Sequence, residues 1–332
     1  MAEITFEEGL AALEAIADTA ETTPTYKLNE TIVINPREDF TDDPSARGTL
    51  VSRYGDILIG TKSDWTADGA LDLNEFPLWL NLSVKGGITP TQPDPTNAPS
   101  VYLWTALPAI TLNDLKTGTL WGFDPNITRM RAAGARCDTL TLTGDNRDII
   151  NFSASGFAHL TEEVTGVVSP AANTSILLPF YGAKAWIEPD GSTDPYGTTP
   201  VPDGLIVSWG FEIDSTWSEK YAANGTGDLS GGGRKARGAN LHIELEMPDL
   251  TYYNMWKAGT HHKVRFRAEG GIIPGTTLNY YWQVDIYGRL NKDDWGSYAD
   301  TNRTIQLTVP SMYENSLGAD WKMYCQNIRA TV

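Results

Sequence analysis

Two segments in the second half of the chain alternate between apolar and polar residues. LIVSWGFEI (205–213) has apolar residues at every odd position, and in LHIELEM (241–247) they alternate with a histidine and two glutamates. Successive side chains of a β-strand point to opposite faces, so such alternation is typical of a strand with one buried face. The 11 Trp and 14 Tyr residues also favour strands, because aromatic rings pack well on a pleated surface. The sequence therefore predicts an all-β fold with short helices.

The first half contains a second pattern of this kind. CDTLTLT (137–143) and IINFSAS (149–155) alternate on either side of a short polar loop, which indicates an antiparallel hairpin with one face in the core. Further strands are expected at 263–268, 280–290, 304–309 and 321–328.

Two segments have helical spacing instead. Phe6, Leu10, Leu13 and Ile16 recur every three or four residues, which predicts an amphipathic helix over 5–20. PDLTYYNMWKAG (248–259) predicts a helix that ends at its last glycine.

The two halves of the chain repeat the same order of features. Residues 63–87 and 243–271 each have a strand, an aspartate, a short helical pattern and a double glycine. A repeated order of elements indicates similarly built units in tandem. We predict an N-terminal helix or arm (1–20), a first β domain (21–165) and a second β domain (176–332), joined by a linker at 166–175.

Long polar segments interrupt the predicted strands. One is NPREDFTDDPSARG (35–48), and the other is residues 214–240, whose distal part reads GTGDLSGGGRKARGAN (225–240). Connections longer than about 15 residues are uncommon in compact domains and usually carry a function. We expect both segments to be arms.

The glycine-rich arm does not match a phosphate-binding loop. A Walker A loop requires Ser or Thr after its lysine, but Ala236 follows Lys235, and a strand is expected next instead of a helix. Gly225, Gly227 and Gly231 also miss the dinucleotide-binding spacing by one position.

The charge and the termini exclude further classes. A formal charge of −17 argues against binding to duplex DNA, which requires a basic surface. No window resembles a membrane span or a signal peptide, so we expect a soluble protein made in the cytoplasm. The two cysteines, Cys137 and Cys325, form no metal-type cluster, and no disulfide is expected.

No motif for catalysis or metal binding is complete. PDGSTDP (189–195) begins like a calcium loop but has proline where glycine is required, and Gly-x-Ser-x-Gly is absent. A pair of carboxylates for glycoside hydrolysis stays open, since such pairs are set by the fold. A carbohydrate-binding β-sandwich also stays open, although most aromatic residues are in phase with apolar strand faces. We expect no enzyme activity, no cofactor and no metal.

Several stretches resemble the major tail tube proteins of long, non-contractile-tailed bacteriophages (siphophages). ETTPTYKL (21–28) is similar to the Glu-Thr-Thr-Pro-Gly-Thr opening common in that family, with a departure at Tyr26. ARCDTLTLTGDNRDIINFSASG (135–156) is similar to its mid-chain hairpin, and GTKSDW (60–65) to one of its strands. The later run from Trp209 to YCQNI (324–328) fits the same layout, so the resemblance covers most of the chain after residue 20.

The resemblance implies a structural virion protein. Such proteins are β-sandwich or barrel-like subunits that close into rings around an inner barrel, and the rings stack into the hollow tube that conducts DNA to the host. Members with two such folds in one chain form trimers that mimic hexamers, and the predicted repeat favours a trimer over a hexamer here. The implied partners are further copies of the chain, a tape measure protein, tail terminator and initiator proteins, and phage DNA that passes without specific binding. The chain is then expected in the phage tail, assembled in the host cytoplasm and without a membrane.

The resemblance also gives the two arms a role, because long loops of that family reach from ring to ring. The hypothesis is an inter-ring assembly arm with a pliable glycine segment and basic docking residues (Gly231, Arg234, Lys235, Arg237), received by an acidic docking arm (Glu38, Asp39, Asp42, Asp43). A hairpin tip whose charge only confers solubility is the competing interpretation. Alternative functions are another virion structural protein, such as a tail terminator or decoration subunit, and a carbohydrate-binding β-sandwich module.

Overall fold

The computed structural model describes residues 9–42, 56–108, 116–123, 129–145, 148–190, 196–221, 229–299 and 302–332. Strands dominate this part of the chain, with two α-helices and one turn of 3₁₀ helix (η1, Phe180–Gly182) among them. The prediction of an all-β fold with short helices is confirmed.

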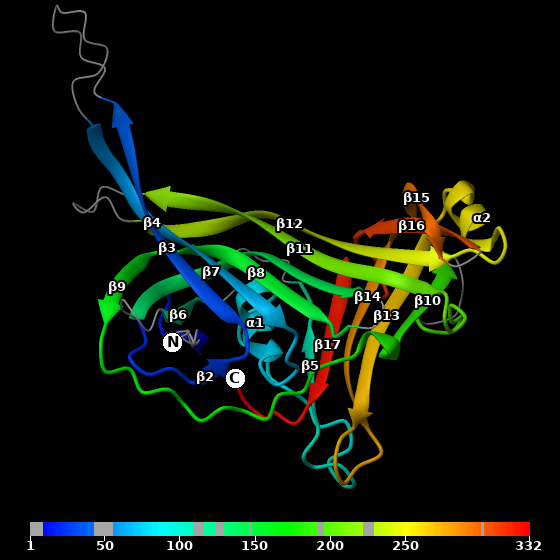
Figure 1. Cartoon of the computed structure of the whole chain (residues 1–332), viewed down its shortest axis with the longest axis horizontal. Helices are drawn as coiled ribbons and strands as arrows, with labels where there is room; N and C mark the ends of the chain where they lie inside the picture. Colours follow the sequence, from blue (N-terminus) through cyan, green and yellow to red (C-terminus); the bar gives the residue numbers. More distant parts are fainter. Residues whose placement is uncertain are drawn as a thin grey trace, which may run out of the picture.

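A large antiparallel sheet forms one side of the molecule (Figure 1). Its strands follow the order β3 (Thr31–Asp42), β4 (Asp56–Ala70), β8 (Asn151–Ala158), β7 (Arg129–Asp145), β11 (Ile206–Tyr221), β12 (Leu229–Glu246), β16 (Asn302–Pro310) and β15 (Asn291–Ala299).

Two smaller groups of strands pack behind it. One has the order β10 (Ala183–Pro189), β13 (His261–Ile272), β14 (Asn279–Arg289), β17 (Trp321–Asn327) and β5 (Tyr102–Ala106). In the other, the beginning of β7 pairs with β9 (Leu160–Val164) and β6 (Gly118–Phe123), followed by β1 (Gly9–Leu13) and β2 (Tyr26–Leu28).

Gly134 lies where β7 passes from the smaller group to the large sheet. Its φ is +66°, and a Cβ there would lie 2.6 Å from an oxygen of Asp18 and 2.9 Å from Cβ of His159. Only glycine adopts this conformation at little cost, so the residue allows one strand to serve both layers.

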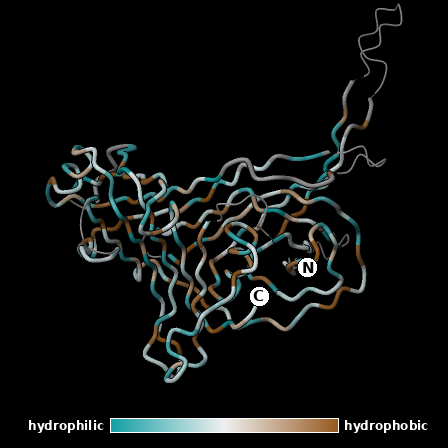
Figure 2. The backbone as a smooth tube through the Cα atoms, turned by 180° about the vertical axis from the view of Figure 1, so that it is seen from behind, coloured by the Kyte–Doolittle hydropathy of each residue, from teal (hydrophilic) through white to brown (hydrophobic). Residues whose placement is uncertain are grey.

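The core lies between the layers and is rich in tryptophan. Trp209 of the large sheet stacks on Trp282 of β14 with ring centroids 5.4 Å apart and planes 13° apart. Under the other half of the large sheet, Trp79 of the buried helix α1 (Phe76–Ser83) lies 6.0 Å from Trp65 and 5.0 Å from Phe152. Because each buried aromatic side chain removes roughly 150–250 Å² from water, these clusters hold the layers together. Figure 2 shows apolar and polar positions alternating along these strands.

The order of elements repeats along the chain. A hairpin (β3–β4, then β11–β12) is followed by a short helix, α1 and then α2 (Thr251–Ala258). In each repeat a later strand of the large sheet pairs with the second strand of the hairpin: β8 pairs with β4, and β16 pairs with β12. The remaining pairs also correspond: β1–β6 with β10–β13, β6–β7 with β13–β14, β7–β8 with β15–β16, and β7–β9 with β14–β17.

Strands from both predicted domains share the sheets. β7 pairs with β11 in the large sheet, β17 pairs with β5, and one hydrophobic core includes residues of both halves. Residues 165–176 form neither helix nor strand. The boundaries 21–165, 166–175 and 176–332 stay a prediction.

The helix predicted over 5–20 is wrong in the described residues, because 9–13 form strand β1. β1 pairs with β2 on one side and β6 on the other. Leu10 and Ala12 pack on Trp121, whereas Ala11 packs into the main core, so the strand alternates between two apolar environments. By contrast, the predicted helix within 248–259 is confirmed, and Gly259 ends it with φ +68°.

In the described residues, the two segments predicted to be arms continue neighbouring strands. Residues 214–221 and 229–240 continue β11 and β12 as a hairpin, in which Gly231, Gly232 and Gly233 lie opposite Lys220, Glu219 and Ser218. Residues 35–42 similarly belong to β3, which pairs with β4 as far as Asp42 and Asp56. In both cases a partner strand supplies the backbone hydrogen bonds that the polar or glycine-rich sequence alone does not indicate. Residues 43–55 and 222–228 lie outside the described part.

Candidate assembly surfaces

The two hairpins β3–β4 and β11–β12 extend beyond the body on the same side of the molecule (Figure 1). Lys62 of β4 joins them, since its Nζ lies 2.6 Å from a carboxylate oxygen of Glu219 on β11. The two segments predicted to be arms therefore lie side by side within one chain.

The predicted basic docking residues lie on the outer part of β12. Arg234 is opposite Trp217, and Arg237 is opposite Ser215 and half-buried. Gly231 lies in the paired strand, which corrects the idea of a pliable segment at that residue. The side chains of Arg234 and Lys235 are outside the described part, so their docking role stays a prediction.

Three of the predicted acidic docking residues, Glu38, Asp39 and Asp42, lie on β3. Glu38 is exposed and opposite Thr61, whereas Asp39 accepts a hydrogen bond from Arg37 at 3.0 Å. Asp42 is the last residue of the strand, and Asp43 lies outside the described residues. The ion pair of Asp39 with Arg37 reduces the negative charge that this arm presents.

The large sheet has one polar face, which sequence reasoning missed as a surface. Along β7 and β11, Leu140, Leu142, Phe211 and Ile213 point into the core, so the residues between them point away from it. Across the sheet these outward positions carry hydroxyls and carboxylates, and we call them the polar face: Asp68, Thr139, Thr141, Thr143, Asp145, Ser153, Ser155, Ser208, Glu212, Asp214, His242, Glu244, Glu246, Gln306 and Thr308.

Hydrogen bonds across neighbouring strands hold the polar face in order. Ser153 donates to Asp68 at 2.6 Å, and Thr304 donates to Glu244 at 2.6 Å. His242 Nδ1 lies 2.7 Å from the Thr308 hydroxyl. Several carboxylates and one histidine thus share a continuous surface, which gives it a negative potential.

Further carboxylates gather where the hairpins leave the body. Burial, and after it the nearby carboxylates of Glu219, Asp214 and Asp64, raise the pKa of Asp138 to about 6, while Lys62 opposes the shift. Burial is thus the largest cause of the shift, and the neighbouring carboxylates add to it.

The large sheet ends in two strands that have a partner on one side only within the described residues. These are β3, which pairs with β4, and β15, which pairs with β16. An edge strand presents unpaired N–H and C=O groups that can pair with another chain. The sheet is therefore open at both ends.

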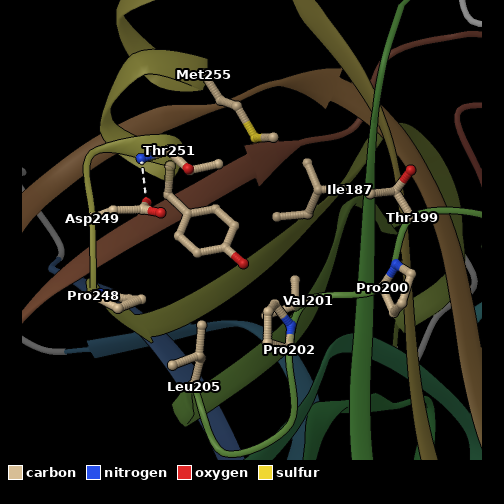
Figure 3. Close-up of a pocket in the computed structure, with 11 residues that line it drawn as sticks. Ile187, Thr199, Pro200, Val201, Pro202, Leu205, Pro248, Asp249, Thr251 and Met255 are labelled. Atoms are coloured by element: carbon tan, nitrogen blue, oxygen red, sulfur yellow. Dashed lines mark hydrogen bonds between the residues drawn. The ribbon is translucent and has the colours of Figure 1, made fainter.

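A separate cavity of about 190 Å³ lies beside α2 (Figure 3). Ile187 and Met255 point into it, and Val201, Pro202 and Leu205 lie below them in the view. Asp249 accepts a hydrogen bond from the Thr251 amide at 2.7 Å and so begins the helix. The hydrogen bonds from Thr251 lower the pKa of Asp249. The lining suits a small apolar group, but it brings no set of polar groups together for catalysis.

A buried carboxylate cluster lies at the other end of the molecule. Burial and the neighbouring Glu75 raise the pKa of Glu30 well above its usual range, and burial raises that of Glu75 to about 7. Asn29 donates its amide to Glu75 at 2.9 Å and its side chain to Asp72 at 2.6 Å. Asp72 also accepts the Ile176 amide at 3.2 Å. The cluster thus ties the turn before β3 to the start of α1 and to the connection between the two repeats.

Other chemical sites are not formed by the described residues. Cys137 and Cys325 are buried free thiols. In the described part, no group of three or more His, Cys, Asp or Glu side chains is arranged to hold a metal ion. No helix in that part is long and apolar enough to cross a membrane.

The surfaces that this chain offers are therefore an acidic sheet face, two open sheet edges and a pair of joined hairpins. Comparisons with protein-family models and with curated proteins find no match to the chain.

Proposed function

We propose that the chain is a structural virion protein that assembles with copies of itself into rings, which stack to form the hollow tail tube of a siphophage. The observation that carries the proposal is the large antiparallel sheet, which has a polar, carboxylate-rich face opposite its core and is open at both ends. A sheet of this kind becomes the wall of a channel when copies join edge to edge, with the polar face inward.

The charge supports a conduit for DNA. Carboxylates repel the phosphates of DNA, and the hydroxyls between them offer no positive anchor. DNA then slides past the wall without specific binding.

The internal repeat supports a ring of three chains. Each chain contributes two similar sets of large-sheet strands, so three chains supply a pseudo-sixfold wall. The joined hairpins then extend beyond the ring and contact the ring that stacks on it. A tape measure protein inside the tube, and terminator and initiator proteins at its ends, complete the proposed set of partners.

Electron microscopy of negatively stained protein, combined with light scattering, tests the proposal. We expect rings or stacked rings with a central channel, and averaged end-on views with three large subunits. Capped single rings favour a tail terminator, and particles that attach only to preformed capsids favour a decoration subunit. A monomer that binds polysaccharide contradicts the proposal and favours the carbohydrate-binding alternative.

A further inference from the structure

One pairing in the large sheet has no counterpart within the chain. The first repeat joins the second through β7 and β11, from the pair Ser208–Asp145 to the pair Asp214–Thr139. In the second repeat β15 takes the place of β7, and in the first repeat β3 takes the place of β11. The counterpart of the β7–β11 junction is therefore a junction between β15 and β3. These two strands are the open edges at opposite ends of the same sheet, so they meet only between different copies.

We propose that β15 of one copy pairs antiparallel with β3 of the next copy, in the register of the internal β7–β11 junction. This inference rests on the proposed ring, and it specifies which edges form the seam and which residues face each other. The proposed junction between copies then has the same strand pairing as the junction between the two halves of one chain.

Matching hydrogen bonds fix the equivalence of the two hairpins. At the end of β4 the Leu71 amide donates to the Ile150 carbonyl at 2.9 Å, and at the end of β12 the Met247 amide donates to the Arg303 carbonyl at 2.9 Å. Leu71 is therefore equivalent to Met247, and Ile150 to Arg303.

Counting residues along β4 and β12 from these equivalent positions shows which residue of β3 corresponds to which residue of β11. Counting back equally from Leu71 and Met247 leads to Asp64 and Asn240, which lie opposite Asn35 and Glu212. Asn35 thus occupies the place of Glu212. In agreement, the flanking Ile34 packs against the core, as its counterpart Phe211 does.

The same counting along β8 and β16 shows which residue of β15 corresponds to which residue of β7. Three residues after Ile150 and Arg303 stand Ser153 and Gln306, which lie opposite Thr141 and Asp294. Asp294 thus occupies the place of Thr141. Because Thr141 pairs with the residue equivalent to Asn35, Asp294 of one copy faces Asn35 of the next.

The chemistry of β3 limits the seam to its first part. Pro36 follows Asn35 and has no N–H to donate, and beyond it the strand continues into the projecting hairpin. The internal junction runs two residues further, to Asp214, whose counterpart on β3 is Arg37, so Pro36 makes the seam shorter than the internal junction. The seam therefore covers Thr31–Asn35 of one copy and Asp294–Tyr298 of the other.

Cysteine cross-linking tests both the edges and the register. Residues directly opposite each other in an antiparallel pair have Cα atoms about 4.5–5.5 Å apart, which a disulfide spans. Full-length protein with Asn35→Cys and Asp294→Cys is oxidised at assembly concentration, and its products are separated by denaturing electrophoresis. The native Cys137 and Cys325 are buried in the core, so they do not compete.

We expect a covalent ladder that stops at three chains, because every copy carries both halves of the seam and a closed ring has no free end. The matched control is Thr31→Cys with Asp294→Cys. Thr31 lies on the same face of β3, but four residues along the strand displace it by roughly 13 Å from the proposed partner. This control and both single-cysteine variants should yield monomers on the gel.

The outcomes separate the seam from the proposed function. Rings or tubes in the microscope without the Asn35–Asp294 cross-link overturn the seam and leave the tube intact. A three-chain cross-link without stacking supports the seam and contradicts the tube. Equal cross-linking by the control pair overturns the register, and a protein that stays monomeric without any cross-link overturns both proposals.

Discussion

At the scale of single residues, Gly134 has the clearest steric requirement. Its positive φ and the nearby atoms of Asp18 and His159 leave no room for a side chain. We expect Gly134→Ala to lower the free energy of unfolding by about 1–3 kcal/mol, because it strains the bend through which β7 joins two layers. Denaturant unfolding at equilibrium measures the loss.

Gly238 is the matched control for this substitution. A Cβ at Gly238 meets nothing within 4 Å, and the residue lies in strand β12. Gly238→Ala should therefore change the free energy of unfolding by less than about 1 kcal/mol. Equal losses for the two variants contradict the assignment of Gly134 as a special position.

Glu30 and Glu75 make stability depend on pH in an unusual direction. The folded protein holds protons on these carboxyls at pH values where the unfolded chain, with ordinary glutamate pKa values, has released them. Their contribution to stability is complete below about pH 4.5, the ordinary value. The contribution of Glu75 is lost as the pH rises through about 7, and that of Glu30 is lost at pH values well above the ordinary glutamate pKa.

We expect Glu30→Gln to weaken this loss, since an amide keeps the site neutral at all pH values. Between pH 5 and pH 8, the fall in the free energy of unfolding should be smaller than in the unmodified protein by on the order of 2 kcal/mol. Urea unfolding at several pH values measures the difference. Glu163→Gln, at an exposed position, should keep the original pH dependence, and an unchanged slope for Glu30→Gln contradicts the prediction.

At the scale of elements, the sequence predicted correctly the strands whose apolar and polar residues alternate. It did not predict the strands that form only because a distant segment pairs with them. Residues 205–213 and 241–247 alternate so regularly that periodicity alone identifies them, and both are strands. Leu10 and Leu13 have a spacing that fits a helix, but the same residues can also form part of a strand. The segment becomes strand β1 because it pairs with β2 and β6, and β6 is distant in sequence. Gly231–Gly233 have low strand propensity, yet β11 opposite them makes a ladder.

The candidate surfaces were harder to predict than the strands for a related reason. Thr139, Thr141 and Thr143 showed that one side of a hairpin is polar. The polar side continues from these residues through Glu212 to Glu244 because β7, β11 and β12 are neighbours in the sheet, and the sequence does not indicate this strand order. The open edges depend on the same long-range pairing, which a single sequence does not encode locally.

The outer part of the β11–β12 hairpin gives the element-scale prediction. We expect the double variant Arg234→Glu, Lys235→Glu to fold and to form rings but to stop them from stacking, because it replaces basic docking residues by acidic ones. Arg237 is left unchanged since it is half-buried and its reversal would also strain the strand. Sedimentation and electron microscopy measure tube length, and circular dichroism checks the fold.

A variant with the opposite chemistry on the other arm provides the control. If the basic residues dock on Glu38 of the next ring, then Glu38→Lys alone should also shorten the tubes, and combining it with the double variant should restore part of the stacking. Tubes of normal length from the double variant would instead favour a hairpin tip whose charge confers only solubility.

At the scale of the whole molecule, the internal repeat and the polar face have one consequence together. If both halves of every chain line the channel, then each carboxylate of the polar face recurs around the ring, and a change at one position acts as many times as there are chains. Glu212 and Asp214 lie on the central strand β11, where the two repeats meet, so they are the residues at which this multiplication is best measured. Their neutralisation tests whether the face lines a DNA channel.

We expect Glu212→Gln with Asp214→Asn to leave ring assembly unchanged and to raise the retention of short DNA in assembled tubes at low salt. The reason is that loss of carboxylates weakens the repulsion of phosphates. The effect should disappear as salt is raised, since screening then removes the repulsion in both proteins. Tubes are incubated with labelled single-stranded DNA, pelleted and counted over a series of salt concentrations.

Glu163→Gln with Asp203→Asn removes the same charge from exposed positions outside the polar face, so its retention of DNA should equal that of the unmodified tube. Equal retention by both double variants would mean that only the overall charge matters and would contradict an inward polar face. Retention that rises for the Glu212 and Asp214 variant alone would place that face along the path of the DNA, because both proteins carry the same net charge and differ only in where it was removed.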